Sequence, residues 1–175
     1  TTVTIDKSKA VGEIPIQTGV SPTGAKTYTV PIQVYPGING FEPQLSLAYN
    51  SQQGNGIVGI GWGIGGVQSI MRTSRNIYYD GKPQGALRTK ADAFVLDGMR
   101  LIKISENATT INYESEQGNI KVKAFLSGDV VKYFEVFYPN GTKGIFGYAS
   151  NTSNKIFYPI VSLSDLRNNQ ILYTY

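Results

Sequence analysis

The side chains that most often carry catalysis are missing from this 175-residue sequence, which contains no histidine and no cysteine. Without cysteine there is no disulfide, no thiol nucleophile and no zinc–thiolate site. Without histidine there is no serine–histidine triad, no HExxH metal motif and no imidazole general base. The remaining candidates for chemistry are a glycine motif, carboxylates, basic residues and aromatic rings.

The glycine motif is G-x-G-x-x-G, formed by Gly61, Gly63 and Gly66. A dinucleotide site needs this pattern to end a strand and begin a helix, whose amide groups hold the pyrophosphate. The residues that follow favour a strand, and only Asp80 stands near the place expected for a ribose-binding acid. We therefore predict no dinucleotide site, and interpret the glycines as a bent strand or bulged loop beside which Trp62 is largely buried.

Paired carboxylates could hydrolyse a glycosidic bond, but the 12 acidic residues are scattered along the chain. Asp80, Asp97 and Asp129 each adjoin a glycine, in positions typical of turns. A carboxylate-based hydrolase stays open as an alternative, although no pair stands out. We assign no catalytic, cofactor-binding or metal-binding residue, and expect no cofactor.

Oxygen-bearing side chains near the C-terminus resemble a weak calcium loop, formed by Asp165, Asn168 and Asn169. Calcium takes about six to eight oxygen ligands, and this segment has too few carboxylates, so we interpret it as a polar hairpin turn. Three Asn-x-Ser/Thr sequons would matter only in a eukaryotic secretory pathway. They begin at Asn107, Asn140 and Asn151.

Basic residues are concentrated between residues 72 and 103, where seven of them accompany three acidic residues. A nucleic-acid-binding patch is one interpretation of this bias. The interleaved aromatic residues are few and no RRM, KH or helix-turn-helix pattern is present, so a solvated loop-and-hairpin region is favoured. We expect no nucleic-acid partner. The seven basic residues are Arg72, Arg75, Lys82, Arg88, Lys90, Arg100 and Lys103.

Alternation of apolar and polar residues with a period of two predicts strands along most of the chain. The clearest examples cover residues 27–34, 44–49, 119–124 and 171–175. Pro31 lacks an N–H group, so its strand should lie at a sheet edge or its ladder should break there.

Turn signals separate these strands. Asp97-Gly98 lies between two apolar runs and predicts a two-residue hairpin. Pro139-Asn140-Gly141 separates two further runs in the same manner, and Ser127-Gly128-Asp129 predicts another turn. The best helical candidate is a single turn at residues 90–93. The sequence predicts an all-β fold of about 10 to 13 short, mainly antiparallel strands in a sandwich or a partial barrel or shell.

Eleven aromatic residues lie in the C-terminal third, where they could form a sugar-stacking platform or a core. Aromatic residues on strands more often form core and cross-strand pairs, so the core is favoured. A glycan- or surface-binding module that uses exposed aromatics stays open. The residues are Phe125, Tyr133, Phe134, Phe137, Tyr138, Phe146, Tyr148, Phe157, Tyr158, Tyr173 and Tyr175.

The chain starts at Thr1 without an initiator Met, and it stops inside an alternating apolar run at Tyr175. We therefore expect it to be the front part of a longer protein. Its predicted organisation is an N-terminal extension at residues 1–20 and an all-β domain at residues 21–175 that continues beyond Tyr175. No run of roughly 18 apolar residues is present, so no membrane-spanning segment is predicted.

Several motifs occur in an order that resembles the N-terminal domain of the Salmonella plasmid virulence protein B family. Similar regions begin the B components of insecticidal toxin complexes and many bacterial RHS/YD-repeat proteins. The motifs include SPTGA at 21–25, PQLSLAYNS at 43–51, GIGWGIGG at 59–66, FVLDGMRL at 94–101 and LSDLRNNQI at 163–171.

This resemblance implies a β-rich region ahead of β-propeller or YD repeats in a large secreted or surface bacterial protein. It also implies that any enzymatic activity lies in a separate C-terminal domain, so no catalytic residue is carried over to this chain. The expected function is a non-catalytic β-scaffold that helps enclose or present a C-terminal effector. The expected partners are the remainder of its own chain and a toxin-complex subunit.

Overall fold

The computed structural model describes residues 15–175, which divide into two compact units. Among these residues, unit 1 holds 15–35 and 43–66, and unit 2 holds Pro36–Glu42 and Val67–Tyr175. Residues 1–14 of the predicted extension lie outside the described residues, whereas Gln17–Val20 form the first strand, β1. The predicted boundary between residues 20 and 21 stays a prediction.

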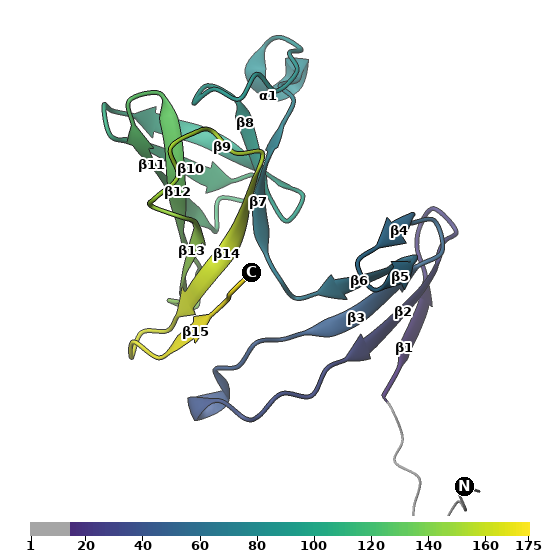
Figure 1. Cartoon of the computed structure of the whole chain (residues 1–175). Helices are drawn as coiled ribbons and strands as arrows, with labels where there is room; N and C mark the ends of the chain where they lie inside the picture. The colour runs from purple at the N-terminus through teal and green to yellow at the C-terminus, as the bar shows by residue number, and fades with distance from the viewer. Residues whose placement is uncertain (1–14) are drawn as a thin grey trace, which may run out of the picture. The chain divides into compact units, whose positions relative to one another are not determined.

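Strands dominate both units, which confirms the predicted all-β class (Figure 1). The described residues form fifteen strands, more than expected because two of them, β4 and β5, have only two residues each. Helical structure in residues 15–175 is limited to the 3-10 turn η1 (Ile38–Gly40) and the four-residue helix α1 (Ile77–Asp80). Neither is long or apolar enough to cross a membrane.

The predicted helical turn at residues 90–93 is wrong, because that segment is a turn leading into a strand. The helix forms instead at Ile77–Asp80, where the Asn76 side chain accepts a hydrogen bond from the Tyr79 amide at 2.9 Å. Gly81 then ends the helix in the left-handed conformation, with a φ of 69°. These are the usual starting and stopping devices of a helix, placed on a segment too short to show an apolar stripe.

Unit 1 is an antiparallel four-stranded sheet with the order β1-β2-β3-β6, accompanied by the small hairpin β4–β5. Strand β2 lies inside this sheet, and its ladder with β3 does not break at Pro31, because Pro31 pairs with Ser46 and the Ile32 amide donates to the Leu45 carbonyl oxygen at 2.9 Å. Strand β1 pairs with β2 only as far as Thr29, so on the β1 side no ladder hydrogen bond requires the N–H group that Pro31 lacks. The strands are β1 (Gln17–Val20), β2 (Lys26–Pro31), β3 (Ser46–Asn50), β4 (Asn55–Gly56), β5 (Gly59–Ile60) and β6 (Trp62–Gly65).

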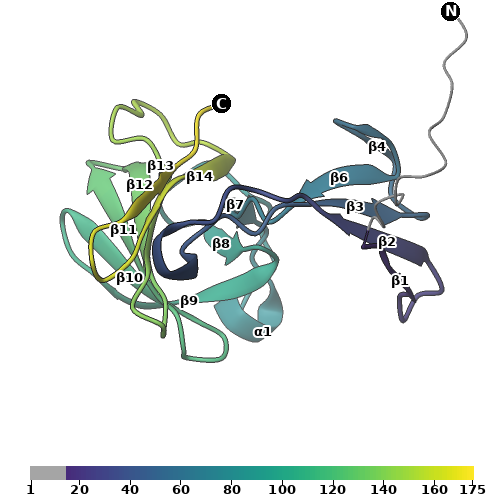
Figure 2. The same ribbon diagram turned by 90° about the horizontal axis from the view of Figure 1, so that it is seen from below.

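Unit 2 is a closed barrel of the eight consecutive strands β7–β14 (Figures 1 and 2). Each strand pairs with the next in an antiparallel manner, and β14 also pairs with β7, which closes the ring. Strand β15 pairs with Ser162–Ser164 of β14, beyond the point where the first residue of β7, Ser69, pairs with Pro159. The strands are β7 (Ser69–Thr73), β8 (Ala93–Leu96), β9 (Met99–Glu106), β10 (Thr110–Ser115), β11 (Lys121–Ser127), β12 (Val130–Phe137), β13 (Lys143–Gly147), β14 (Phe157–Ser164) and β15 (Gln170–Leu172).

The predicted hairpin turns are present in the barrel, although the connection from β12 to β13 is longer than two residues. Asp97 and Gly98 connect β8 and β9 with φ values of 48° and 84°, as a hairpin of this length requires. Gly128 and Gly141 likewise adopt positive φ values, of 58° and 82°, between β11 and β12 and between β12 and β13. Turn chemistry in the sequence therefore fixes three of the barrel's connections.

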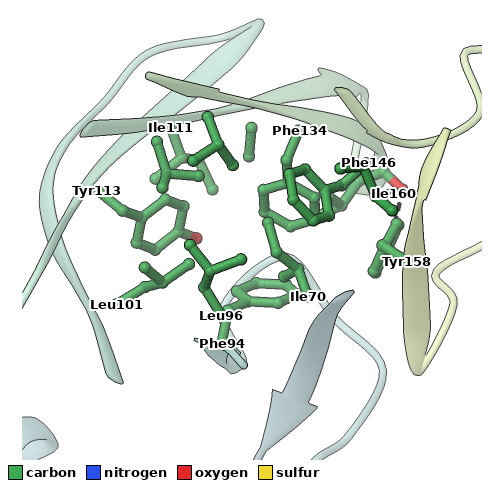
Figure 3. Close-up of a cluster of buried hydrophobic side chains, with 14 residues drawn as sticks. Ile70, Phe94, Leu96, Leu101, Ile111, Tyr113, Phe134, Phe146, Tyr158 and Ile160 are labelled. Atoms are coloured by element: carbon green, nitrogen blue, oxygen red, sulfur yellow. Dashed lines mark hydrogen bonds between the residues drawn. The ribbon is translucent and has the colours of Figure 1, made fainter. Parts of the chain in front are cut away.

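The barrel interior is filled by side chains that alternate inward along its strands (Figure 3). The Phe94 ring packs edge-on against Phe134 with centroids 5.0 Å apart, and Phe134 packs against Tyr158 at 4.9 Å. Such edge-to-face contacts add to the apolar area that the rings bury. The cluster comprises Ile70, Phe94, Leu96, Leu101, Ile111, Tyr113, Val122, Ala124, Val131, Phe134, Val136, Phe146, Tyr158 and Ile160.

Truncation at the centre of this core should be far more costly than truncation of an aromatic residue on the surface. Phe134 is fully buried, and we expect Phe134→Ala to lower the free energy of unfolding by about 3–5 kcal/mol. Phe157 is 50% exposed, and Phe157→Ala should cost about 1 kcal/mol or less. Urea denaturation followed by circular dichroism measures both. Equal losses in the two variants would contradict this account of the core.

Candidate functional site

The glycine motif lies in a strand context and does not lead into the helix that a dinucleotide-binding loop requires. Residues Trp62–Gly65 are strand β6, and the next element is strand β7 in place of the required helix. The glycines permit close backbone contacts instead: a Cβ on Gly56 would lie 1.8 Å from the Trp62 carbonyl oxygen. A Cβ on Gly66 would lie 1.8 Å from the Gln44 carbonyl oxygen, and Gly66 also has a φ of 86°.

One face of the unit 1 sheet gathers apolar side chains from three strands. Tyr49 lies directly between Tyr28 and Trp62, with ring centroids at 5.6 Å and 5.1 Å. Beside this aromatic row, Val30, Leu47 and Ile64 of the same three strands form a second, aliphatic row. We call the six residues of the two rows the apolar face: Tyr28, Val30, Leu47, Tyr49, Trp62 and Ile64.

The apolar face is only partly covered within the described residues. Tyr28 and Ile64 are exposed, and the other four residues are intermediate. Trp62 is mostly but not fully buried, in line with the expectation, and its ring packs against Tyr49. Among the described residues of unit 1, Ala25 is the only hydrophobic residue that is fully buried.

A buried ion pair joins β7 to the start of β8 in unit 2. The Arg72 and Asp92 side chains are 0% and 5% exposed, and their nearest nitrogen and oxygen atoms are 2.9 Å apart. Arg72 also donates to the Tyr158 hydroxyl at 3.2 Å and lies over the Phe94 ring at 4.8 Å. The other acceptors of Arg72 are the carbonyl oxygens of Thr89 and Lys155 and the side-chain oxygen of Asn154. We call this group the Arg72 cluster.

Asp92 is held ionised in this setting. Its burial by itself would raise its pKa, but hydrogen bonds from the Leu87 and Thr89 amides, followed by that from Arg72, outweigh the burial and lower the pKa. A general acid needs the opposite shift, toward neutral pH. Asp80, which lines the same cavity as Asp92, is paired with Arg100 at 2.6 Å. Both carboxylates are therefore the counter-ions of arginine side chains.

Most of the seven basic residues between residues 72 and 103 are engaged in contacts within unit 2, in contrast to the solvated region that the sequence favours. Arg72 and Arg100 are buried in ion pairs, and Lys90 and Lys103 both pair with Glu106. Arg75 donates to Gln84 and Ala91. Lys82 and Arg88 are exposed. The charge bias that the sequence shows is thus used largely to hold the segment between β7 and β8 against the barrel.

The calcium-like segment is the polar hairpin turn that we predicted. Asp165 Oδ1 accepts from the amides of Arg167 and Asn169 at 2.8 Å and 2.9 Å, and its Oδ2 accepts from the Asn169 side chain at 2.7 Å. These bonds, the one from the Asn169 side chain foremost, lower the pKa of Asp165. Asn168 occupies the left-handed conformation with a φ of 62°. Residues 15–175 contain no cluster of three or more acidic side chains suited to a metal ion.

The sequons also lie in locally bonded positions. The Asn107 and Asn140 side chains accept hydrogen bonds from the amide two residues further on, at 2.9 Å and 3.0 Å, as turn-forming asparagines do. The Asn151 side chain donates to the Lys132 carbonyl oxygen at 2.8 Å.

The aromatic residues of the C-terminal third divide between core and surface. Phe134, Phe146 and Tyr158 are fully buried, which confirms the core interpretation for them. The Phe125 and Tyr133 rings stack on each other, 4.5 Å apart and almost parallel, so each ring covers a face that a sugar would need. Exposed rings also occur, at Phe137, Tyr148, Phe157 and Tyr175.

Sequence reasoning missed the Arg72 cluster, although a signal for it exists. Arg72 stands two residues after Ile70 on a strand, so both side chains point to the same face, and Ile70 is fully buried. An arginine on an inward-facing position needs an anionic partner, and Asp92 is one of the three acids in that stretch.

The closed barrel and the four-stranded sheet define an all-β module. Residues 20–166 match the family model described as SpvB, Salmonella virulence plasmid 65kDa B protein, and the chain belongs to this family. A chain of the "Crystal Structure of TcdB2-TccC3" shares the fold, with a TM-score of 0.74 over 94% of this chain at 19% identity. This chain spans 9% of the length of that one. No curated protein matches.

Neutralising Asp92 should weaken the barrel in a pH-dependent manner. Asp92→Asn leaves Arg72 buried without a counter-ion, so we expect the free energy of unfolding at pH 7 to fall by about 3–5 kcal/mol. Because folding lowers the pKa of Asp92, its ionisation stabilises the protein fully above the ordinary pKa of 3.8, and this stabilisation is lost as the pH falls through the lowered pKa.

The cost of Asp92→Asn should therefore shrink between pH 7 and about pH 2.5, as measured by urea unfolding at each pH. Asp129→Asn is the control, because the Asp129 side chain is 84% exposed and should show little effect at either pH. An Asp92→Asn penalty that is the same at both pH values would contradict the role given to the ion pair.

Proposed function

We propose that this chain is a non-catalytic scaffold module of a larger secreted or surface bacterial protein related to toxin complexes. In this role it helps to form a β-rich shell that encloses or presents an effector carried elsewhere in the protein. Membership of the SpvB family and the fold shared with a much longer toxin chain support the proposal.

The observation that carries the proposal is the incomplete burial of the apolar face of unit 1. A sheet is stable when its apolar face is buried against a second layer, and the described residues of unit 1 supply none. Trp62 and Tyr49 together offer a large apolar area that another layer would remove from water. The remainder of a longer polypeptide, including its β-propeller or YD-repeat regions, is the layer that we propose.

The barrel of unit 2 supports the same role. Its interior is occupied by aromatic and aliphatic side chains, among them Phe94, Phe134 and Tyr158, so it is a packed core and not a binding chamber. Asp80 and Asp92, the two carboxylates that line the same cavity, each form an ion pair with an arginine. The packed barrel is thus expected to be rigid, as a structural element of a shell must be.

Hydrogen exchange tests the proposal. Amides of β2, β3 and β6 should exchange at least about tenfold more slowly in the polypeptide encoded by the complete gene than in residues 1–175 alone, because the second layer suppresses local opening. Amides of the barrel strands β10–β12 are the internal control and should be protected in both. Equal exchange of β2, β3 and β6 in the two proteins would contradict the proposal.

A glycan-binding module is the second candidate, favoured by the aromatic row on the apolar face. Against it, the neighbouring rings of Tyr28, Tyr49 and Trp62 are inclined to each other by 47° and 50°, so they present no common plane to a sugar. A glycan array decides between the two candidates.

We expect residues 1–175 to give no signal on such an array. Tyr78→Ala changes an 83% exposed ring outside the apolar face and serves as the control. Binding that is lost in Trp62→Ala and kept in Tyr78→Ala would establish the glycan function in place of the scaffold function.

A further inference from the structure

A small polar cavity lies in unit 2, between the barrel wall and the segment that connects β7 to β8. Its volume is about 150 Å³, which is space for several water molecules at about 30 Å³ each. The charged side chains that line it are four basic and two acidic: Arg75, Lys90, Arg100, Lys103, Asp80 and Asp92.

Within the part of the chain that the structure describes, two guanidinium groups of this cavity have incomplete sets of partners: Arg100 pairs with Asp80 but keeps one unbonded donor, and Arg75 has no counter-ion. The Arg100 side chain is 9% exposed, and its Nε is buried without any hydrogen-bond acceptor. Arg75, half-buried, donates only to the neutral oxygens of Gln84 and Ala91, and no carboxylate among residues 15–175 lies within ion-pairing distance of it. A partly buried cation without a counter-ion, next to an orphaned donor, is costly unless an anion compensates it.

The two acids of the cavity do not supply this compensation. Asp92 already accepts bonds from Leu87, Thr89 and Arg72. Asp80 accepts from the Arg100 guanidinium at 2.6 Å and from the Asn76 amide at 2.9 Å.

The two lysines have their own acidic neighbours outside the cavity lining. Lys90 lies 3.4 Å from Glu106 and 3.0 Å from Asp129, and Lys103 also pairs with Glu106. The Lys90 and Lys103 side chains are 36% and 50% exposed, so they can turn toward a ligand. Arg75 is therefore the cation that a ligand would neutralise.

We propose that this cavity binds a phosphate-sized oxyanion, with the Arg75 guanidinium as its main ligand and Lys103 and Lys90 at its rim. A guanidinium group presents parallel N–H donors that match the oxygens of a phosphate, and such charge-assisted bonds are stronger than neutral ones. Arg100 forms the wall of the site. The ligand is a free phosphate ion or a phosphate group carried on a larger molecule.

Isothermal titration of residues 1–175 with sodium phosphate tests the site, with sodium chloride holding the ionic strength constant. We expect one saturable site per chain. Arg75→Gln should weaken binding at least about tenfold, because a hydrogen bond between charged groups contributes that much. Arg75→Lys keeps the positive charge but lacks the paired N–H donors of a guanidinium group, so this variant should bind phosphate with intermediate affinity.

Lys82→Gln is the matched control, because it removes an equal charge from the same connecting segment but outside the cavity lining, and its affinity should stay within about twofold. Circular dichroism verifies folding of each variant. If Arg75→Gln does not fold, Lys103→Gln replaces it, with an expected loss of about threefold at this half-exposed side chain.

A parallel titration with glycerol phosphate distinguishes the two sources of the ligand. Binding of inorganic phosphate alone assigns the site to a free ion, and comparable binding of both assigns it to a phosphate group on a larger molecule. No saturable binding to the wild-type chain, or equal losses in Arg75→Gln and Lys82→Gln, would overturn the proposal.

Discussion

Closure of the barrel rests on the short seam between β7 and β14, on which the rest of unit 2 depends. Only three residue pairs join these strands, among them Ile70 with Tyr158. Arg72 reinforces the seam from inside: its amide donates to the Ile156 carbonyl oxygen at 2.8 Å, and its side chain reaches Tyr158, Asn154 and the Lys155 carbonyl oxygen. Because a closed barrel has no free edges, this seam turns a long meander into a rigid unit.

The two units differ in how completely they bury their own apolar side chains. The barrel buries fourteen hydrophobic residues in one cluster, whereas the described part of unit 1 buries Ala25 alone. The four-stranded sheet carries an aromatic row on one face and small residues such as Gly63 and Gly65 on the other, and an apolar sheet face is normally buried against a second layer. This imbalance is the physical basis of the proposal that unit 1 packs against a further layer in a larger protein.

Local features of the fold could be predicted from the sequence, because local chemistry determines them. The Asp97-Gly98 hairpin and the strand in place of a helix after Gly66 follow from backbone conformational preferences that each residue carries with it. Barrel closure could not be predicted, because it depends on pairing between residues near 70 and 158 that no short-range pattern encodes. The remaining exposure of Trp62 could not be predicted either, because the degree of burial depends on side chains that lie far away in the sequence.

The central claim is that the apolar face of unit 1 is built to be covered by another part of a larger protein. An experimental structure of the polypeptide encoded by the complete gene tests this claim most directly. The claim predicts that Tyr28, Tyr49 and Trp62 become fully buried under β-structure from outside residues 1–175. An apolar face that still borders solvent in that structure would contradict it.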